Sequence, residues 1–132
     1  MENIEQLLKD SSILIVDDIK DNVYALSAFL ESYGVNVESA GSGREALTLV
    51  NRKTFDVVLM DIRMPEMDGF EVIRQIRSNE KIAGIPIMAV TAQAMPGDAD
   101  KCRKKGADDY ISKPINTELL VEKLGKILGK KS

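Results

Sequence analysis

The stretch FDVVLM at residues 55–60 is a short, almost continuous apolar run, and Asp61 follows it directly. ILIV at residues 13–16 and IPIMAV at residues 85–90 have the same character. Short runs rich in branched apolar residues are typical of strands that are covered on both faces. VNVE at residues 35–38 alternates apolar and polar positions, which predicts an edge strand with one face in water. DYIS at residues 109–112 is the weakest of the five predicted strands.

Helical patterns separate these five runs. Apolar residues at helical spacing fill residues 23–33, Ser42 and Glu45 form a capping box, and Asp68-Gly69 opens a third helix. A short polar helix is expected from about residue 98 to Gly106. A last helix is expected to begin at Asn116 and to bury Leu119, Leu120, Leu124, Ile127 and Leu128. A further helical turn is expected at Ile4, Leu7 and Leu8.

The strict alternation of strands and helices predicts the α/β class, with a parallel sheet between two layers of helices. Right-handed crossovers leave few topologies for such a chain. With residues 35–38 at an edge, we expect a doubly wound, flavodoxin-like sheet of five parallel strands in the order 2-1-3-4-5, in three αβα layers. The 132 residues predict one domain, with residues 1–11 as an N-terminal extension and residues 129–132 as a basic tail.

The composition excludes several classes of function. A net charge of −3 argues against non-specific nucleic-acid binding, and the apolar runs are much shorter than the about 18 residues of a membrane span. No signal peptide is recognisable, and a single cysteine, Cys102, fits a reducing cytoplasm. The chain has no histidine, which excludes Ser-His-Asp catalysis, histidine-ligated zinc and a phosphohistidine of its own.

Polar residues follow the predicted strands at the edge where doubly wound sheets bind ligands. Asp17 and Asp18 follow the first strand, Asp61 follows the third, Thr91 ends the fourth and Lys113 follows the fifth. Three carboxylates, a hydroxyl and an ammonium are therefore expected to meet there.

Two carboxylates ~4 Å apart repel by ~4 kcal/mol at the effective dielectric of a protein surface. A divalent cation would offset this repulsion, and oxygen ligands without His or Cys favour Mg²⁺ over zinc. Asp61, on the predicted central strand, is the expected nucleophile toward phosphorus. Lys113 and Thr91 would hold phosphoryl oxygens.

The chain resembles the receiver domain of the response-regulator family from about residue 13 to residue 128. The motifs that carry the resemblance are VDD at residues 16–18, MDIRMPEMDG at 60–69, VTA at 90–92 and GADDYISKP at 106–114. The resemblance implies that Asp61 accepts a phosphoryl group from a histidine kinase or a histidine phosphotransfer protein.

The same resemblance implies roles for other residues. Asp17 and Asp18 would hold Mg²⁺ together with Asp61 and the backbone carbonyl of Arg63. Lys113 would pair with the phosphoryl group, and the Lys113–Pro114 peptide bond would be cis.

Thr91 and Tyr110 would form a conformational switch that reshapes one face for a protein target: the helix from residue 98, the strand at 109–112 and the last helix. Arg63 and Gln93 would tune hydrolysis of the acyl phosphate. By the resemblance the chain is a signalling domain, monomeric or weakly dimeric, and not a true enzyme. Both a stand-alone regulator and a receiver of a hybrid histidine kinase fit.

Two other classes of function would use part of this pattern. A haloacid-dehalogenase-like phosphatase also uses an Asp nucleophile with Mg²⁺, but its motif needs a second aspartate where Arg63 stands, and its nucleophile follows the first strand. A purely structural interaction module would not need Asp61. A dinucleotide-like GSGREA at residues 41–46 follows the edge strand rather than the first strand, so it is interpreted as a helix cap.

Overall fold

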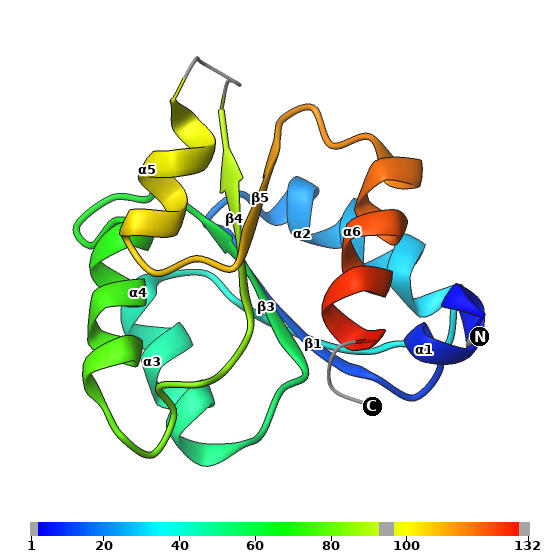
Figure 1. Cartoon of the computed structure of the whole chain (residues 1–132), viewed down its shortest axis with the longest axis horizontal. Coiled ribbons are helices and arrows are strands. Elements are labelled where there is room, and N and C mark those ends of the chain that lie inside the picture. Colours follow the sequence, from blue (N-terminus) through cyan, green and yellow to red (C-terminus); the bar gives the residue numbers. More distant parts are fainter. Residues whose placement is uncertain (1–2, 93–96, 130–132) are drawn as a thin grey trace.

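Five parallel strands form one sheet in the order β2-β1-β3-β4-β5 in the computed structural model, which describes residues 3–92 and 97–129 (Figure 1). The predicted topology and the edge position of the half-polar strand are confirmed. The strands are β1 (Ser12–Val16), β2 (Asn36–Ala40), β3 (Val57–Asp61), β4 (Ile87–Thr91) and β5 (Asp109–Ser112).

Helices cover both faces of the sheet, which confirms the three-layer architecture. In Figure 1, α3, α4 and α5 lie on one side of the sheet and α1, α2 and α6 on the other. The helices are α1 (Ile4–Leu8), α2 (Lys20–Glu31), α3 (Gly43–Arg52), α4 (Gly69–Ser78), α5 (Asp98–Lys104) and α6 (Thr117–Gly129).

Each face of the sheet has its own hydrophobic core, because successive strand residues point to opposite faces. Val58 and Met60 of β3 pack with side chains of α3, α4 and α5, whereas Val57 and Leu59 pack with those of α1, α2 and α6. All four are completely buried. The central strand is therefore fixed on both sides, and so is Asp61 at its end.

Capping hydrogen bonds confirm the predicted starts of α3 and α4. Ser42 Oγ accepts the N–H of Glu45, and Asp68 Oδ1 accepts the N–H of Glu71 at 2.9 Å. The prediction that Leu119 is buried is wrong, since 41% of it is exposed. The buried stripe of α6 runs through residues 120, 124, 127 and 128, and Leu119 lies beside it in the first turn.

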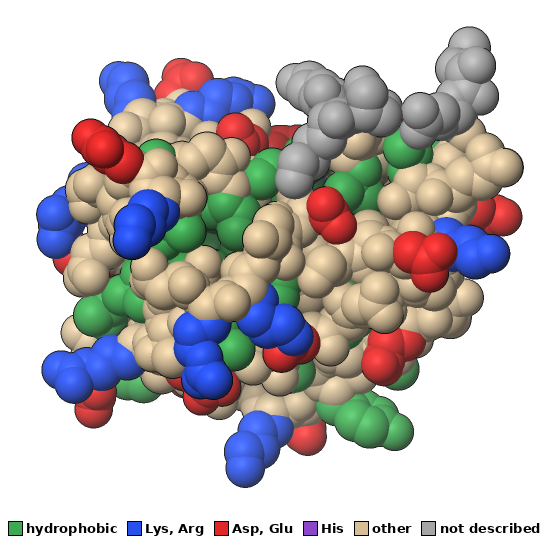
Figure 2. All heavy atoms as spheres, turned by 90° about the horizontal axis from the view of Figure 1, so that it is seen from below, with side chains coloured by type: hydrophobic (Ala, Val, Ile, Leu, Met, Phe, Trp, Pro, Cys, Tyr) green, Lys and Arg blue, Asp and Glu red, His purple; other side chains and the backbone are tan. Residues whose placement is uncertain are grey.

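The face seen in Figure 2 carries basic and acidic side chains that alternate around scattered apolar ones. Among the coloured residues, no extended patch of one sign covers this face. Within the described ranges, no helix has both the length and the apolar character that a bilayer crossing requires.

Arg77 of α4 contacts two other segments, the loop that follows α4 and the turn before β5. Its guanidinium donates hydrogen bonds to the backbone carbonyls of Gly106 at 2.8 Å and of Ala83 and Ile85 at 2.6 Å. It also pairs with Asp108 at 3.0 Å, and the same carboxylate oxygen accepts the N–H of the first residue of β4. With only 23% of its side chain exposed, Arg77 anchors α4 to the starts of β4 and β5.

We expect Arg77→Met to lower the free energy of unfolding by about 3 kcal/mol, because it removes the donor to three backbone carbonyls and the cation that pairs with Asp108. Urea unfolding at neutral pH measures the change. Arg74→Met is the matched control: it removes the same charge from the same helix, but at an exposed side chain that pairs only locally with Glu71. Equal losses in the two variants would contradict the anchoring role of Arg77.

Candidate functional site

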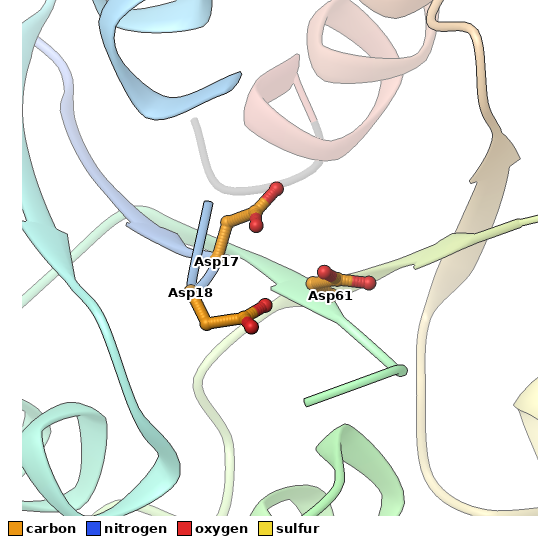
Figure 3. Close-up of side chains that lie close together, drawn as sticks. All are labelled: Asp17, Asp18 and Asp61. Atoms are coloured by element: carbon orange, nitrogen blue, oxygen red, sulfur yellow. The ribbon is translucent and has the colours of Figure 1, made fainter. Parts of the chain in front are cut away.

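The carboxyl ends of neighbouring strands bring three acidic side chains together. Asp61 is the last residue of β3, and Asp17 and Asp18 directly follow β1, which pairs with β3. Each of the three offers a carboxylate oxygen, and these oxygens all lie within 4.8 Å of one another. Figure 3 shows the three side chains projecting from the ends of the two strands at the same edge of the sheet.

Lys113, directly after β5, extends across this edge to the acidic residues. Its Nζ lies 3.2 Å from Asp61 Oδ2 and 3.4 Å from Asp17 Oδ2. The side chains of Asp61 and Asp17 are only 5% and 8% exposed, whereas Asp18 is exposed to solvent. One ammonium balances one of three carboxylates, so the cluster keeps an excess of negative charge in a poorly solvated place.

Hydrogen bonds hold the two buried carboxylates in place. Asp17 Oδ1 accepts the N–H of Ile19 at 2.9 Å, and Asp17 Oδ2 accepts Asn22 Nδ2 at 3.4 Å. Asp61 Oδ1 accepts the N–H of Arg63 at 3.2 Å. Asn22 is not among the predicted site residues, although its place five residues after Asp17, in the first turn of α2, was a usable signal.

The close approach of α4 to β3 depends on Gly69. A Cβ at this position would lie 2.4 Å from the carbonyl oxygen of Asp61 and 2.8 Å from the Cα of Ile62. The N–H of Gly69 also donates to the carbonyl of Ile62 at 2.9 Å. A glycine at the first residue of α4 thus lets the loop after Asp61 close tightly.

Burial and charge act in opposite directions on the two central ionisable groups. Burial raises the pKa of Asp61 above 3.8, Lys113 offsets part of this increase, and the Asp17 carboxylate adds to it. Burial alone would lower the pKa of Lys113, but the neighbouring Asp61 and Asp17 carboxylates outweigh it and raise the pKa. Lys113 therefore stays an ammonium. Keeping the Asp61 carboxylate ionised in this buried place lowers the stability of the folded chain.

This cost predicts a pH-dependent difference between the wild type and Asp61→Asn in metal-free buffer. A carboxyl group whose pKa is raised by folding contributes stability below its unfolded pKa and loses it as the pH rises through the folded pKa. We expect Asp61→Asn to be more stable at pH 7 by on the order of 1 kcal/mol. We expect the difference to shrink as the pH falls toward 3.8. Urea unfolding with EDTA measures both; a wild type more stable than the variant at pH 7 would contradict the argument.

The acidic cluster opens into a cleft of about 580 Å³ between α2 and the connection from β5 to α6. Asp17, Asp61 and Lys113 line its polar end. Its other walls are largely apolar and include Leu26, Phe29, Pro114 and Ile115. A group that enters this cleft can therefore reach the Asp61 carboxylate, while the rest of the molecule that carries the group contacts the apolar walls.

Thr91 lies on the strand next to Asp61 but lines a different, smaller cleft of about 170 Å³, together with Arg63. Ala92 lines both clefts. The carbonyl of Thr91 accepts the N–H of Lys113 at 2.7 Å, so the ends of β4 and β5 are joined beside the acidic cluster.

Two of the remaining predicted residues, Tyr110 and Arg63, lie in the part of the chain that the structure describes. Tyr110 is half-buried on the edge strand β5 and packs against the core shared with α3, α4 and α5. The side chain of Arg63 is exposed, and Gln93 lies outside the described residues. The Lys113–Pro114 peptide bond is cis, as the resemblance implied.

A family model described as "Response regulator receiver domain" matches residues 13–125. Among curated proteins, probable histidine kinase 4 of Oryza sativa subsp. japonica is 39% identical over 93% of this chain, but the chain spans only 14% of that protein. The polar-differentiation response regulator DivK of Brucella ovis is 38% identical over 89% of this chain and 96% of its own length.

Two of the solved structures with the same fold contain a bound metal ion or a bound partner protein. The receiver domain of a sensor histidine kinase from Pseudomonas aeruginosa, with a magnesium ion coordinated in its active-site cleft, is 35% identical over 91% of this chain and 98% of its own. Its TM-score is 0.83. The Saccharomyces cerevisiae Ssk1 receiver domain, co-crystallised with the histidine phosphotransfer protein Ypd1, is 28% identical over 93% of this chain and 92% of the matched chain, with a TM-score of 0.86.

Proposed function

The chain belongs to the response regulator receiver domain family, a family of two-component signalling, and on that premise we propose that Asp61 is its phosphoryl acceptor. The observation that carries the proposal is the position of Asp61 itself. It ends the buried central strand, contacts Lys113 at 3.2 Å, lies beside two further aspartates and faces an open cleft. Asp61 is 4% exposed, so its carboxylate is poorly hydrated, which favours its action as a nucleophile.

The donor set of the cluster fits Mg²⁺. Asp17, Asp18 and Asp61 offer only oxygen ligands, at a spacing that one ion can bridge. The backbone carbonyl of Arg63 is the proposed fourth protein ligand. When bound, Mg²⁺ would neutralise the carboxylates and orient the oxygens of the entering phosphoryl group. The magnesium-bound receiver domain from P. aeruginosa supports this assignment.

The proposed reaction is a direct phosphoryl transfer. A carboxylate oxygen of Asp61 forms a bond to phosphorus as the N–P bond of a phosphohistidine breaks, and the bonding electron pair stays on the imidazole nitrogen. The ammonium of Lys113 balances the charge that the phosphoryl oxygens bring into the site. This chain has no histidine, so the phosphohistidine belongs to a donor outside the sequence given, a histidine kinase or a histidine phosphotransfer protein.

The cleft suggests how the donor approaches. On α2, which lines the cleft, Tyr24 is 78% exposed, and Ile19, directly before this helix, is 49% exposed. Exposed apolar side chains on the element that also lines a mostly apolar cleft favour a protein donor over a small phosphate ester. The complex of the yeast Ssk1 receiver domain with Ypd1 supports a donor of this class.

Phosphorylation is proposed to switch the face formed by α5, β5 and α6. The new group carries roughly −1.5 to −2 charges, and Thr91, at the end of the adjacent strand, would bond its oxygens. Tyr110 would then turn inward, and the ensemble would shift between existing states. The downstream target would bind the altered face.

The relatives differ in architecture, since the chain spans nearly all of DivK but a small part of the rice histidine kinase. We propose one receiver domain, with residues 1–11 as an N-terminal extension. Its only catalysis would be its own phosphorylation and dephosphorylation.

Incubation with acetyl phosphate and MgCl₂, followed by intact-mass spectrometry, tests the proposed function. We expect the mass to increase by one phosphoryl group per chain, and EDTA to prevent the increase. Continuous turnover of p-nitrophenyl phosphate without a stable phosphorylated chain would instead indicate a phosphatase and contradict the proposal.

A further inference from the structure

Lys123 of α6 contacts the two residues that begin the edge strand β5. Its Nζ lies 3.1 Å from Asp109 Oδ1 and 4.9 Å from the centroid of the Tyr110 ring. The side chains of Lys123 and Asp109 are only 18% and 19% exposed, which is low for an ion pair at the rim of a sheet. An ammonium so placed is attracted both to the carboxylate and to the face of the ring.

Asp109 links the same ammonium to the backbone of Tyr110. Its Oδ1 accepts the N–H of Tyr110 at 2.8 Å as well as the Lys123 Nζ. One carboxylate oxygen therefore fixes the main chain of Tyr110 and the position of the cation that lies over its ring. A change in the position of this ring alters its contact with Lys123, while the backbone hydrogen bond can persist.

From these contacts we propose that Lys123 is a positioning residue for Tyr110. It stabilises the ring in the place that it occupies in this structure, and so sets how readily the α5–β5–α6 face switches. The inference rests on the proposed function, because it assigns a regulator to the proposed Tyr110 switch. It adds a residue ten positions beyond Lys113, on another element, that pairs with Asp109 and Tyr110 rather than with the acidic cluster.

A Lys123→Met variant tests the inference, because methionine keeps much of the apolar stem and removes the charge. All tyrosines are labelled as 3-fluorotyrosine, and the Tyr110 signal is assigned by its loss in Tyr110→Phe. In the unphosphorylated wild type and in its beryllofluoride complex, the ¹⁹F signal of Tyr110 is expected at two different positions. Without phosphorylation, Lys123→Met is expected to move this signal toward the second position, with the ratio of the two states changed about fivefold.

Two further variants separate positioning from a general effect of charge or stability. Lys126→Met removes the same charge from the same helix, at a side chain that is 70% exposed and pairs with Glu122, and should leave the Tyr110 signal in place. Lys123→Arg keeps a cation that can pair with Asp109 and lie over the ring, and should restore the wild-type position. If Lys123→Met fails to fold, Lys123→Gln makes the same comparison.

The outcomes distinguish this inference from the proposed function. A Tyr110 signal that beryllofluoride moves in the wild type, but that Lys123→Met leaves unchanged, would overturn the inference alone. An equal movement in Lys126→Met would overturn it too, because the effect would then be one of net charge. A wild-type signal that is unaffected by beryllofluoride would overturn the proposed switch and, with it, any regulatory role of Lys123.

Discussion

Asp61→Asn is expected to abolish phosphorylation of the chain by acetyl phosphate or by a phosphorylated histidine phosphotransfer protein. The amide has no carboxylate oxygen to attack phosphorus, and no other acidic group lies in the same position at the end of the central strand. We expect the rate of labelling to fall by a factor of about 10³ or more. Intact-mass spectrometry over a time course measures the loss.

The matched control is Asp100→Asn, which removes the same charge from an exposed position on α5. It should be phosphorylated at the wild-type rate. The metal-free unfolding measurements described above ensure that Asp61→Asn is compared as a folded protein. Undiminished labelling of Asp61→Asn would contradict the assignment of the acceptor.

Asp18→Asn is expected to raise the magnesium concentration needed for half-maximal phosphorylation by roughly a hundredfold. The substitution removes one of three clustered carboxylates, and therefore much of the attraction for a divalent cation. Asp18 is exposed, so the contacts among Asp17, Asp61 and Lys113 can survive the change. Labelling rates across a MgCl₂ titration measure the effect.

Asp21→Asn, in the exposed first turn of α2, is the control for a loss of negative charge near the cleft. Its magnesium requirement should stay close to that of the wild type, because Asp21 is not among the three clustered carboxylates. An unchanged requirement in Asp18→Asn would exclude Asp18 as a ligand. It would leave two carboxylates to explain any metal dependence.

The fold could be predicted from local patterns because the sheet is parallel and buried. Runs such as residues 13–16 have no polar face, so they identify strands covered on both sides, and the alternating second strand identifies an edge. The strand starts were less accurate: β3 begins at Val57 and β4 at Ile87, later than the apolar runs suggest. Apolar character continues into the loops that cover the core, and it does not mark the first paired residue.

The acidic part of the site was also predictable, since residues directly after neighbouring parallel strands must meet at one edge. Contacts that cross between elements were not. Arg77 and Lys123 act through groups far away in sequence or on another element, and their own neighbours in the sequence give no sign of those partners. The partners of a long polar side chain depend on how the helices pack, which a one-dimensional pattern does not record.

Peptide mapping of the phosphorylated wild-type chain by tandem mass spectrometry tests the central claim most directly. The chain would be phosphorylated in MgCl₂ by a phosphohistidine donor and digested under conditions that preserve acyl phosphates. The account predicts a single modified residue, Asp61, in the peptide that spans the end of β3. A phosphoryl group on any other residue, or transfer that proceeds equally well in EDTA, would contradict it.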